Sequence, residues 1–151
     1  MEANKKTEDH EAIKTTIQHY IDGAISGRGE DMKPAFHEGA TIFGYVGDEL
    51  FAGPIQGLFD WNDQNGPAKE LVIRVVGVDI FETIATARLE CDNWTGHKYT
   101  DFLSLLKVDG EWKIMNNLAQ QLFEDKGGKN LHLEHIEDEI LNYGITGGRA
   151  S

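Results

Sequence analysis

The sequence has few of the residues that several common kinds of protein require. Its single cysteine, Cys91, excludes an intramolecular disulfide. Only 14 lysine and arginine residues stand against 26 aspartates and glutamates, a formal net charge of −12. Binding to nucleic acid or to an anionic membrane is therefore not expected, because phosphates require clustered basic residues. No apolar run approaches the roughly 18 residues of a membrane span, and the N-terminus lacks the apolar core of a secretory signal, so a cytoplasmic location is predicted.

Several motifs that identify enzymes are missing as well. There is no phosphate-binding glycine loop, no Gly-x-Ser-x-Gly elbow and no Cys-x-x-Cys pair. His132 and His135 lie three residues apart near Glu139, a spacing that permits a surface metal contact but is more typical of a solvated polar face. Cys91 has no neighbouring base and is expected to be a buried structural thiol. We therefore predict no metal site and no cofactor.

The sequence does contain a pattern of helices followed by strands. Ile13, Ile17, Tyr20 and Ala24 recur at helical spacing and predict a long N-terminal helix over residues 8–25. The other predicted elements are a short helix over 30–37, strands over 41–46 and 50–52, a helix between 53 and 65, and strands over 71–78, 83–92, 99–108 and 112–118. This order is typical of an α+β fold in which helices pack on one face of a curved antiparallel sheet.

The clearest local signal is Asp109-Gly110, which lies between two β-type runs. Such a pair predicts a tight hairpin, because a type I′ turn needs positive φ at both of its central residues. Further along the chain, glycine pairs at 127–128 and 147–148 bracket an amphipathic helix pattern. We therefore divide the 151 residues into a domain over 1–126 and a helical tail over 127–151. The tail is expected to dock on its own domain, to recruit a partner, or to be an added segment.

Four segments carry a resemblance to a known superfamily. They are residues 20–23 (YIDG), 36–41 (FHEGAT), 43–46 (FGYV) and 99–114 (YTDFLSLLKVDGEWKI). Together they resemble the nuclear transport factor 2-like (NTF2-like) superfamily, in its putative lumazine-binding branch near the SnoaL-like polyketide cyclases, over about residues 8–120. The resemblance implies a cone-shaped, cystatin-like fold whose curved antiparallel sheet wraps a long N-terminal helix around an apolar pocket. It also implies a homodimer that packs sheet against sheet.

The steroid isomerases of this superfamily provide a first test of chemistry. They use a carboxylate base, together with a tyrosine and a protonated carboxylic acid that bind the oxyanion. By resemblance, Tyr20 matches the tyrosine, the base position falls at Gly44 and the acid position falls near Ser104. Glycine cannot take a proton, so no robust steroid-isomerase activity is predicted.

A second constellation resembles the Asp-Arg-Asp arrangement of the superfamily's epoxide hydrolases. Arg88 and Glu90 lie two residues apart on a predicted strand and therefore share a face. If Thr95-Gly96 is a two-residue turn, Glu90 falls opposite Asp101, and two facing carboxylates near an arginine can form an acid–base pair. Alternation argues against a place in the pocket, because Ser104, expected inside by resemblance, lies on the opposite face from Asp101. Arg88, Glu90 and Asp101 are thus expected to point outward.

The same alternation predicts the residues that line the pocket. They are Leu89, Cys91, Phe102, Ser104, Leu106, Ile114, Asn116 and Leu118, closed by Tyr20, Phe36 and Trp61 from the helices. The alternative is that these residues pack a core. Two functions remain: a binder of a small apolar or aromatic ligand, or an isomerase, cyclase or dehydratase in which Tyr20 donates a hydrogen bond and Asp101 or Glu90 carries the proton. The orientation of Asp101 discriminates between them.

Overall fold

The computed structural model describes residues 2–122, so the predicted tail over 127–151 lies outside the described residues. The helices are α1 (Glu2–Ser26), α2 (Gly29–Met32) and α3 (Gln56–Asn65), with a 3₁₀ turn at Lys33–Ala35. The strands are β1 (Phe36–Val46), β2 (Glu49–Pro54), β3 (Val72–Phe81), β4 (Ile84–Trp94), β5 (His97–Val108) and β6 (Glu111–Leu122). The short helix expected over 30–37 is split between α2 and the 3₁₀ turn, because Pro34 is tolerated only in a first turn.

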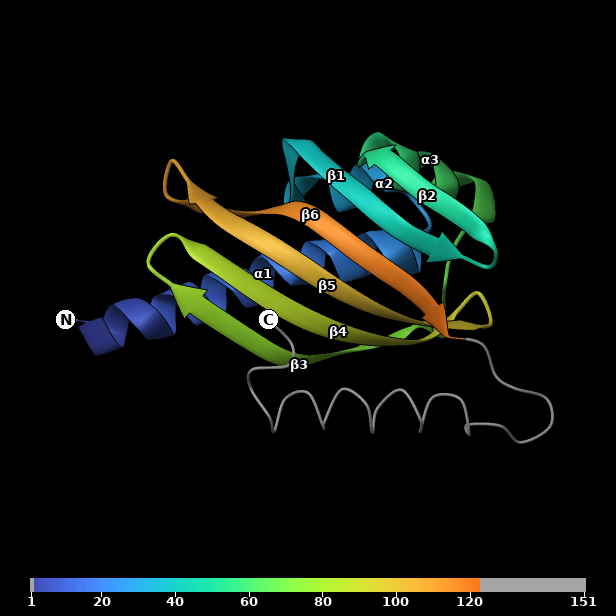
Figure 1. Ribbon diagram of the computed structural model, residues 1–151. Helices are drawn as coiled ribbons and strands as arrows, with labels where there is room; N and C mark the ends of the chain where they lie inside the picture. The colour runs from blue at the N-terminus through green and yellow to red at the C-terminus, as the bar shows by residue number, and fades with distance from the viewer. Residues whose placement is uncertain (1, 123–151) are drawn as a thin grey trace, which may run out of the picture.

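The six strands form one sheet in the order β2-β1-β6-β5-β4-β3. Four neighbouring pairs are antiparallel, but β1 and β6 run parallel. The expectation of a purely antiparallel sheet is therefore wrong, and the sheet is mixed. After the β1–β2 hairpin, α3 carries the chain to the opposite edge, and three antiparallel hairpin steps then bring β6 back beside β1 (Figure 1).

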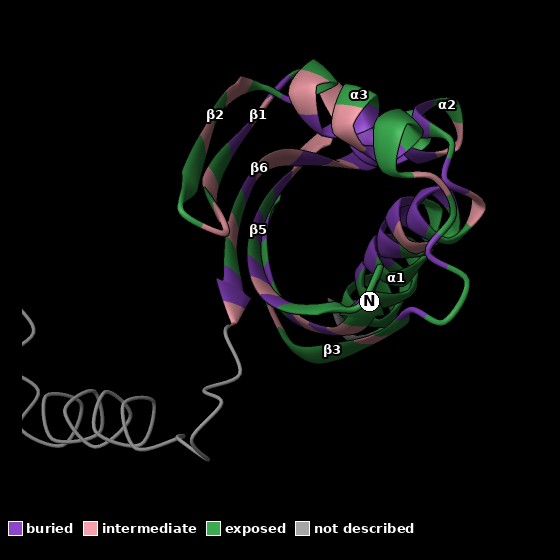
Figure 2. Ribbon diagram, turned by 90° about the vertical axis from the view of Figure 1, so that its right-hand side faces the viewer, coloured by how far each residue is buried: buried purple, intermediate pink, exposed green. Residues whose placement is uncertain are grey.

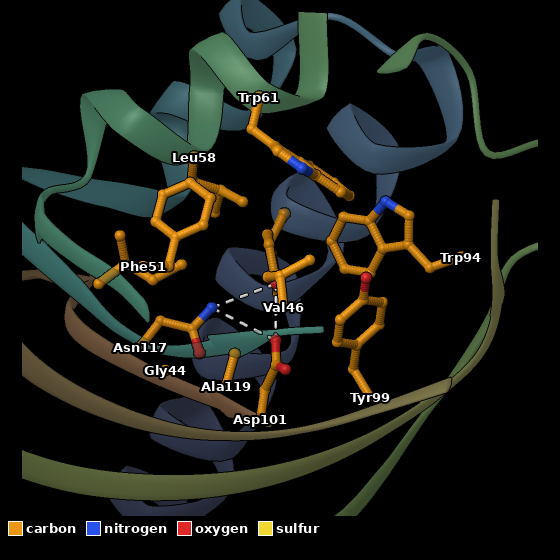
Figure 3. A pocket seen from close by; sticks show the side chains of 12 residues that line it. Gly44, Val46, Phe51, Leu58, Trp61, Trp94, Tyr99, Asp101, Asn117 and Ala119 are labelled. Atoms are coloured by element: carbon orange, nitrogen blue, oxygen red, sulfur yellow. Dashed lines mark hydrogen bonds between the residues drawn. The ribbon is translucent and has the colours of Figure 1, made fainter. Parts of the chain in front are cut away.

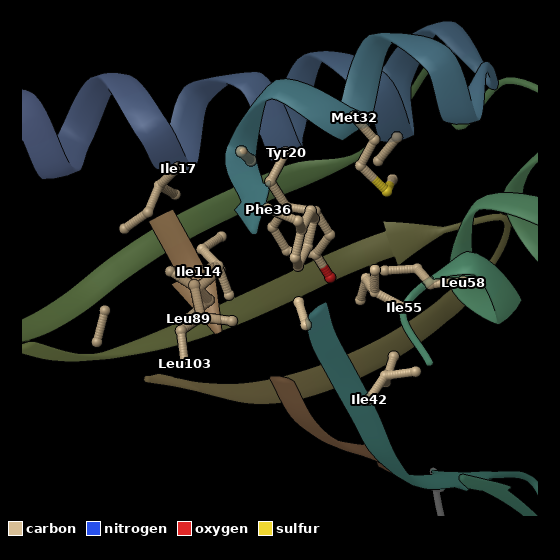
Figure 4. Packing of buried hydrophobic residues seen from close by; sticks show 14 of the residues in the cluster. Ile17, Tyr20, Met32, Phe36, Ile42, Ile55, Leu58, Leu89, Leu103 and Ile114 are labelled. Atoms are coloured by element: carbon tan, nitrogen blue, oxygen red, sulfur yellow. The ribbon is translucent and has the colours of Figure 1, made fainter. Parts of the chain in front are cut away.

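The sheet curls around α1, which lies along its concave face (Figure 2). Ile13, Ile17, Tyr20 and Ala24 are all buried, as their helical spacing predicts. These side chains pack against inward-facing residues of the strands, including Leu89, Leu103 and Ile114 (Figure 4). The Asp109-Gly110 hairpin is confirmed: both residues have positive φ, 51° and 81°, and Val108 pairs with Glu111 across the turn.

Polar contacts tie α3 to the end of α1 and to the start of α2. The Nδ2 of Asn62 on α3 donates to the Gly23 carbonyl of α1 at 2.9 Å, and the Gly29 amide donates to Asp63 Oδ1 at 2.7 Å. These bonds hold α3 over the open side of the sheet. Within residues 2–122, no helix combines the length and the apolar character needed to cross a membrane.

Candidate functional site

A narrow pocket lies between α1, α3 and the concave face of the sheet (Figure 3). Its cavity volume is about 30 Å³, and its mouth opens to solvent. It is lined by Tyr20, Ile42, Gly44, Val46, Phe51, Leu58, Trp61, Trp94, Tyr99, Asp101, Asn117 and Ala119. The lining is mostly apolar and aromatic with a few polar groups, which is the usual composition of a small-molecule site.

The polar groups at the centre of the pocket form a hydrogen-bonded triad of Tyr20, Asp101 and Asn117. The hydroxyl of Tyr20 donates to Asp101 Oδ2 at 2.6 Å. Asn117 Nδ2 donates to the Tyr20 hydroxyl at 3.2 Å and to Asp101 Oδ2 at 3.3 Å. All three side chains are buried, and they come from α1, β5 and β6. The long helix and two adjacent strands thus hold the Asp101 carboxylate in one orientation.

Burial dominates the electrostatics of this triad. Loss of solvent raises the pKa of Asp101 from 3.8 to about 6, although the hydrogen bonds from Tyr20 and Asn117 partly oppose this rise. Burial, together with the neighbouring Asp101, also holds the pKa of the Tyr20 hydroxyl well above its usual 10.0. Tyr20 therefore remains a neutral donor, while Asp101 gains and loses its proton near neutral pH, where a general acid or base is most effective.

Three further polar atoms in the pocket wall are buried and have no hydrogen-bond partner among residues 2–122. They are Trp94 Nε1, Tyr99 Oη and Asn117 Oδ1. Burial raises the pKa of Tyr99 to about 12, so this hydroxyl also stays protonated. No group of three or more histidine, cysteine or carboxylate side chains in the described part of the chain is arranged to hold a metal ion.

The orientation of β5 is the opposite of the one predicted. Asp101 points into the pocket and is 1% exposed, whereas Phe102 and Ser104 lie on the outer face. The two-residue turn at Thr95-Gly96 is present, with Trp94 paired to His97. However, β4 has one extra residue between Cys91 and Trp94, which shifts the register by one position. Leu89, rather than Glu90, is therefore the partner of Asp101.

Glu90 lies on the other face of the sheet from Asp101. Its Oε2 accepts a hydrogen bond from Arg88 Nε at 2.8 Å, and its Oε1 accepts one from the Thr100 hydroxyl at 3.0 Å. The predicted arrangement of Glu90 opposite Asp101 is consequently wrong. Of the two candidate proton carriers, only Asp101 lines the pocket.

A second irregularity changes the inward-facing residues of β6. The register slips between Ser104 and Leu105, so that Met115 is the extra residue between Ile114 and Asn116. Ile114 is buried as predicted, but beyond the bulge Asn117 faces inward. Leu118 is 51% exposed, and Asn116 Nδ2 donates to Thr41 Oγ1 at 2.8 Å. The predictions that Asn116 and Leu118 line the pocket are therefore wrong.

The other predicted lining residues lie in four different environments. Tyr20 and Trp61 line the pocket, while Phe36, Leu89 and Cys91 are buried in the core beside it. Phe102, Ser104 and Leu118 border a hollow on the outer face, and Leu106 is half-buried. Phe43, Phe102 and Leu118 leave this outer face apolar and exposed, which is compatible with a sheet-to-sheet homodimer; the homodimer stays a prediction.

Gly44 lines the pocket at a position that no other residue can occupy without rearrangement. Its φ is 156°, and a Cβ built there would overlap the carbonyl oxygen of Ala119 on β6. Gly44→Ala is therefore expected to lower the free energy of unfolding by about 1–3 kcal/mol, as overpacking does elsewhere. Urea denaturation measures the change. Gly77→Ala, where a Cβ has nothing within 4 Å, is the control and is expected to change stability by less than about 0.5 kcal/mol. Equal stability of both variants would contradict the close contact at Gly44.

Comparison with known proteins identifies relatives of the whole cone. Residues 8–118 match the family described as "Putative lumazine-binding". Aldolase FrzH of Cladobotryum sp is 30% identical over 111 residues, which cover 73% of this chain and 89% of that protein. Two solved structures of NTF2-like proteins of unknown function are also similar. One, from Methylobacillus flagellatus, has 47% identity and a TM-score of 0.75 over 77% of this chain and 94% of its own. The other, from Shewanella baltica, has 36% identity and a TM-score of 0.74 over 78% and 97%.

Proposed function

The chain belongs to the putative lumazine-binding family and has the NTF2-like fold, and we propose that within this fold it is an enzyme that moves a proton in a small, largely apolar carbonyl compound. The observation that carries the proposal is the buried Asp101 carboxylate, which lines an apolar pocket and hydrogen-bonds to Tyr20 at 2.6 Å. A carboxylate in such a place, with its pKa raised to about 6, is suited to general acid–base catalysis near neutral pH.

The geometry supports a division of roles within the triad. Tyr20 and Asn117 both donate to Asp101 Oδ2, so Oδ1 is the oxygen placed to take a proton from the substrate. Removal of a proton from the carbon next to a carbonyl leaves an enolate, and Asp101 then holds that proton as a carboxylic acid. Return of the proton to a different atom gives an isomerase. Loss of a β-hydroxyl as water gives a dehydratase, and attack of the enolate on a second carbonyl gives an aldol product.

The name of one relative agrees with this class of chemistry. FrzH is called an aldolase, and aldol reactions proceed through an enol or enolate beside a carbonyl. The present chain covers 89% of that protein at 30% identity. We extend to this chain only the shared step, which is proton transfer at the carbon next to a carbonyl. Steroid isomerisation by the familiar arrangement is still not expected, since Gly44 occupies the position of the base.

Binding without catalysis is the second candidate function. The aromatic side chains Phe51, Trp61, Trp94 and Tyr99 supply flat apolar walls on which a ring compound can stack. The family description points to lumazine, a flat heterocycle, as a first ligand to test. In this case Asp101 and Asn117 would orient the ligand without exchanging a proton with it.

Hydrogen–deuterium exchange separates the two functions. The protein is incubated in D₂O with 2-indanone, whose CH₂ groups flank a carbonyl on a small apolar ring, and loss of the CH₂ signal is followed by proton NMR. An enzyme should accelerate exchange above the buffer rate, and the rate should rise with pH through about 6 as Asp101 ionises. The Glu90→Gln variant, changed on the outer face, should accelerate exchange in 2-indanone as much as the wild type does. If 2-indanone binds but its exchange is not accelerated at any pH, the result would favour a ligand-binding function and contradict the proposed proton transfer.

A further inference from the structure

Two buried donors in the pocket wall are not used by the triad. Trp94 is 3% exposed and Tyr99 is 5% exposed, and neither Trp94 Nε1 nor Tyr99 Oη has a hydrogen-bond partner among residues 2–122. An indole N–H can only donate a hydrogen bond, so its partner must be an acceptor. Buried polar groups in folded proteins are nearly always paired, and an unpaired one calls for an explanation.

The turn before β5 holds Trp94 in this position. Asn93 and Thr95 on either side of it both have positive φ, 63° and 49°, and Gly96 follows at 90°. Positive φ at Thr95 and Gly96 is what their two-residue hairpin turn requires, and Asn93 lies in the bulge of β4. The extra residue in β4 lies in the same stretch. Trp94 thus lies between the bulge and the turn, and its side chain lines the pocket.

Ring packing leaves the two donors little freedom to find other partners. The Trp94 ring lies 5.9 Å from the ring of Tyr99 at an interplanar angle of 76°, and 6.1 Å from the ring of Trp61 at 66°. It also packs on Tyr20, at 5.8 Å. Edge-to-face contacts of this kind are favourable and directional. Figure 3 shows that Trp94 and Tyr99 border the same space as the Asp101 carboxylate.

We propose that Trp94 Nε1 and Tyr99 Oη bind the carbonyl oxygen of the substrate. This inference rests on the proposed function, because it places the carbonyl of a substrate whose neighbouring carbon meets Asp101. Two neutral donors aimed at an oxygen stabilise the charge that develops on it when the enolate forms. The substrate class is then a neutral ring ketone or a cyclic amide. A carboxylate ligand is disfavoured, because the pocket contains the Asp101 carboxylate and no lysine or arginine among residues 2–122 lines it.

The test compares the binding of two ligands of the same shape. 2-Indanone carries a carbonyl where indane carries a CH₂ group, and dissociation constants for both are measured by ligand-observed NMR. The wild type should bind 2-indanone about tenfold more tightly than indane, a ratio of dissociation constants that corresponds to two hydrogen bonds of ordinary net strength. Tyr99→Phe and Trp94→Phe should each reduce the preference to about threefold while indane binding stays within about twofold of wild type. Tyr45→Phe, an exposed tyrosine outside the pocket, should keep the full preference.

Each outcome bears on the proposal. No preference for the ketone in the wild type, or a preference that both variants retain, would overturn it. Tyr99→Phe removes a single oxygen, so it remains informative if Trp94→Phe does not fold. Asp101→Asn separates this inference from the proposed function: loss of hydrogen–deuterium exchange with the tenfold preference kept supports both. If the wild type binds 2-indanone with the preference but never accelerates exchange, the carbonyl site stands and the proposed proton transfer fails.

Discussion

Asp101→Asn is expected to lower the rate of hydrogen–deuterium exchange in 2-indanone by about 10²–10⁴-fold, the usual contribution of a positioned general acid or base. Asparagine has nearly the same shape, and its Oδ1 can still accept the hydrogen bonds that Tyr20 and Asn117 give to Asp101 Oδ2. The pocket should therefore keep its form while the group that takes the proton is lost. Exchange is measured by proton NMR at pH 7.5, where most Asp101 side chains are ionised.

The matched control is Glu90→Gln, the same change from carboxylate to amide on the other face of the sheet. It breaks contacts with Arg88 and Thr100 but none in the pocket. The control should catalyse exchange in 2-indanone at the wild-type rate. If Asp101→Asn retained full activity, or if Glu90→Gln lost as much as Asp101→Asn, the assignment of Asp101 as the proton carrier would be wrong.

The same Asp101→Asn variant is expected to be more stable than the wild type at pH 7, by up to about 3 kcal/mol. Folding raises the pKa of Asp101 from 3.8 to about 6. At pH values between these two, the folded protein therefore binds more protons than the unfolded chain. The contribution of Asp101 to the free energy of unfolding is therefore fully present below pH 3.8 and is lost as the pH rises through about 6. Asparagine does not ionise and avoids that loss. Urea denaturation at pH 4 and pH 7 measures the difference.

Only the difference between the two proteins is informative, because other carboxylates titrate equally in both. Asp9 is one of these: hydrogen bonds from Trp112 and Lys107 lower its pKa, so its contribution is lost as pH falls. The two proteins should have nearly equal stability at pH 4 and diverge toward pH 7. A variant less stable than the wild type at pH 7 would mean that ionised Asp101 stabilises the fold, contrary to its burial.

Much of the fold follows from local sequence. The apolar stripe on α1 predicts which helix face is buried, and Asp109-Gly110 predicts the β5–β6 hairpin, because each signal depends on residues close together in the chain. The parallel pairing of β1 with β6 does not follow in this way. It joins segments some 75 residues apart, such as Thr41 and Asn116, and no local pattern specifies such a pairing.

The site was harder to predict because side-chain alternation is sensitive to a single extra residue. One bulge in β4 places Asp101 opposite Leu89, and one in β6 turns Asn117 inward in place of Asn116. The helix pattern and the resemblance predict Tyr20, whereas Asp101 is a candidate that alternation predicts to point outward. Trp94, Tyr99 and Asn117 are not among the predicted residues. One sequence feature does point to Trp94, because it lies at the end of a predicted strand, directly before the Thr95-Gly96 turn, and functional side chains often lie at strand ends.

The proposed function requires that Asp101 is a buried carboxyl that titrates near neutral pH inside the pocket. A carbon-13 NMR titration of the side-chain carboxyl, assigned by its absence in Asp101→Asn, measures this pKa directly. The predicted midpoint is about 6, and Tyr20→Phe should move it higher, since the Tyr20 hydrogen bond lowers the pKa. A midpoint at or below 4 in the wild type, unchanged by Tyr20→Phe, would contradict the role of Asp101 as a proton carrier near neutral pH.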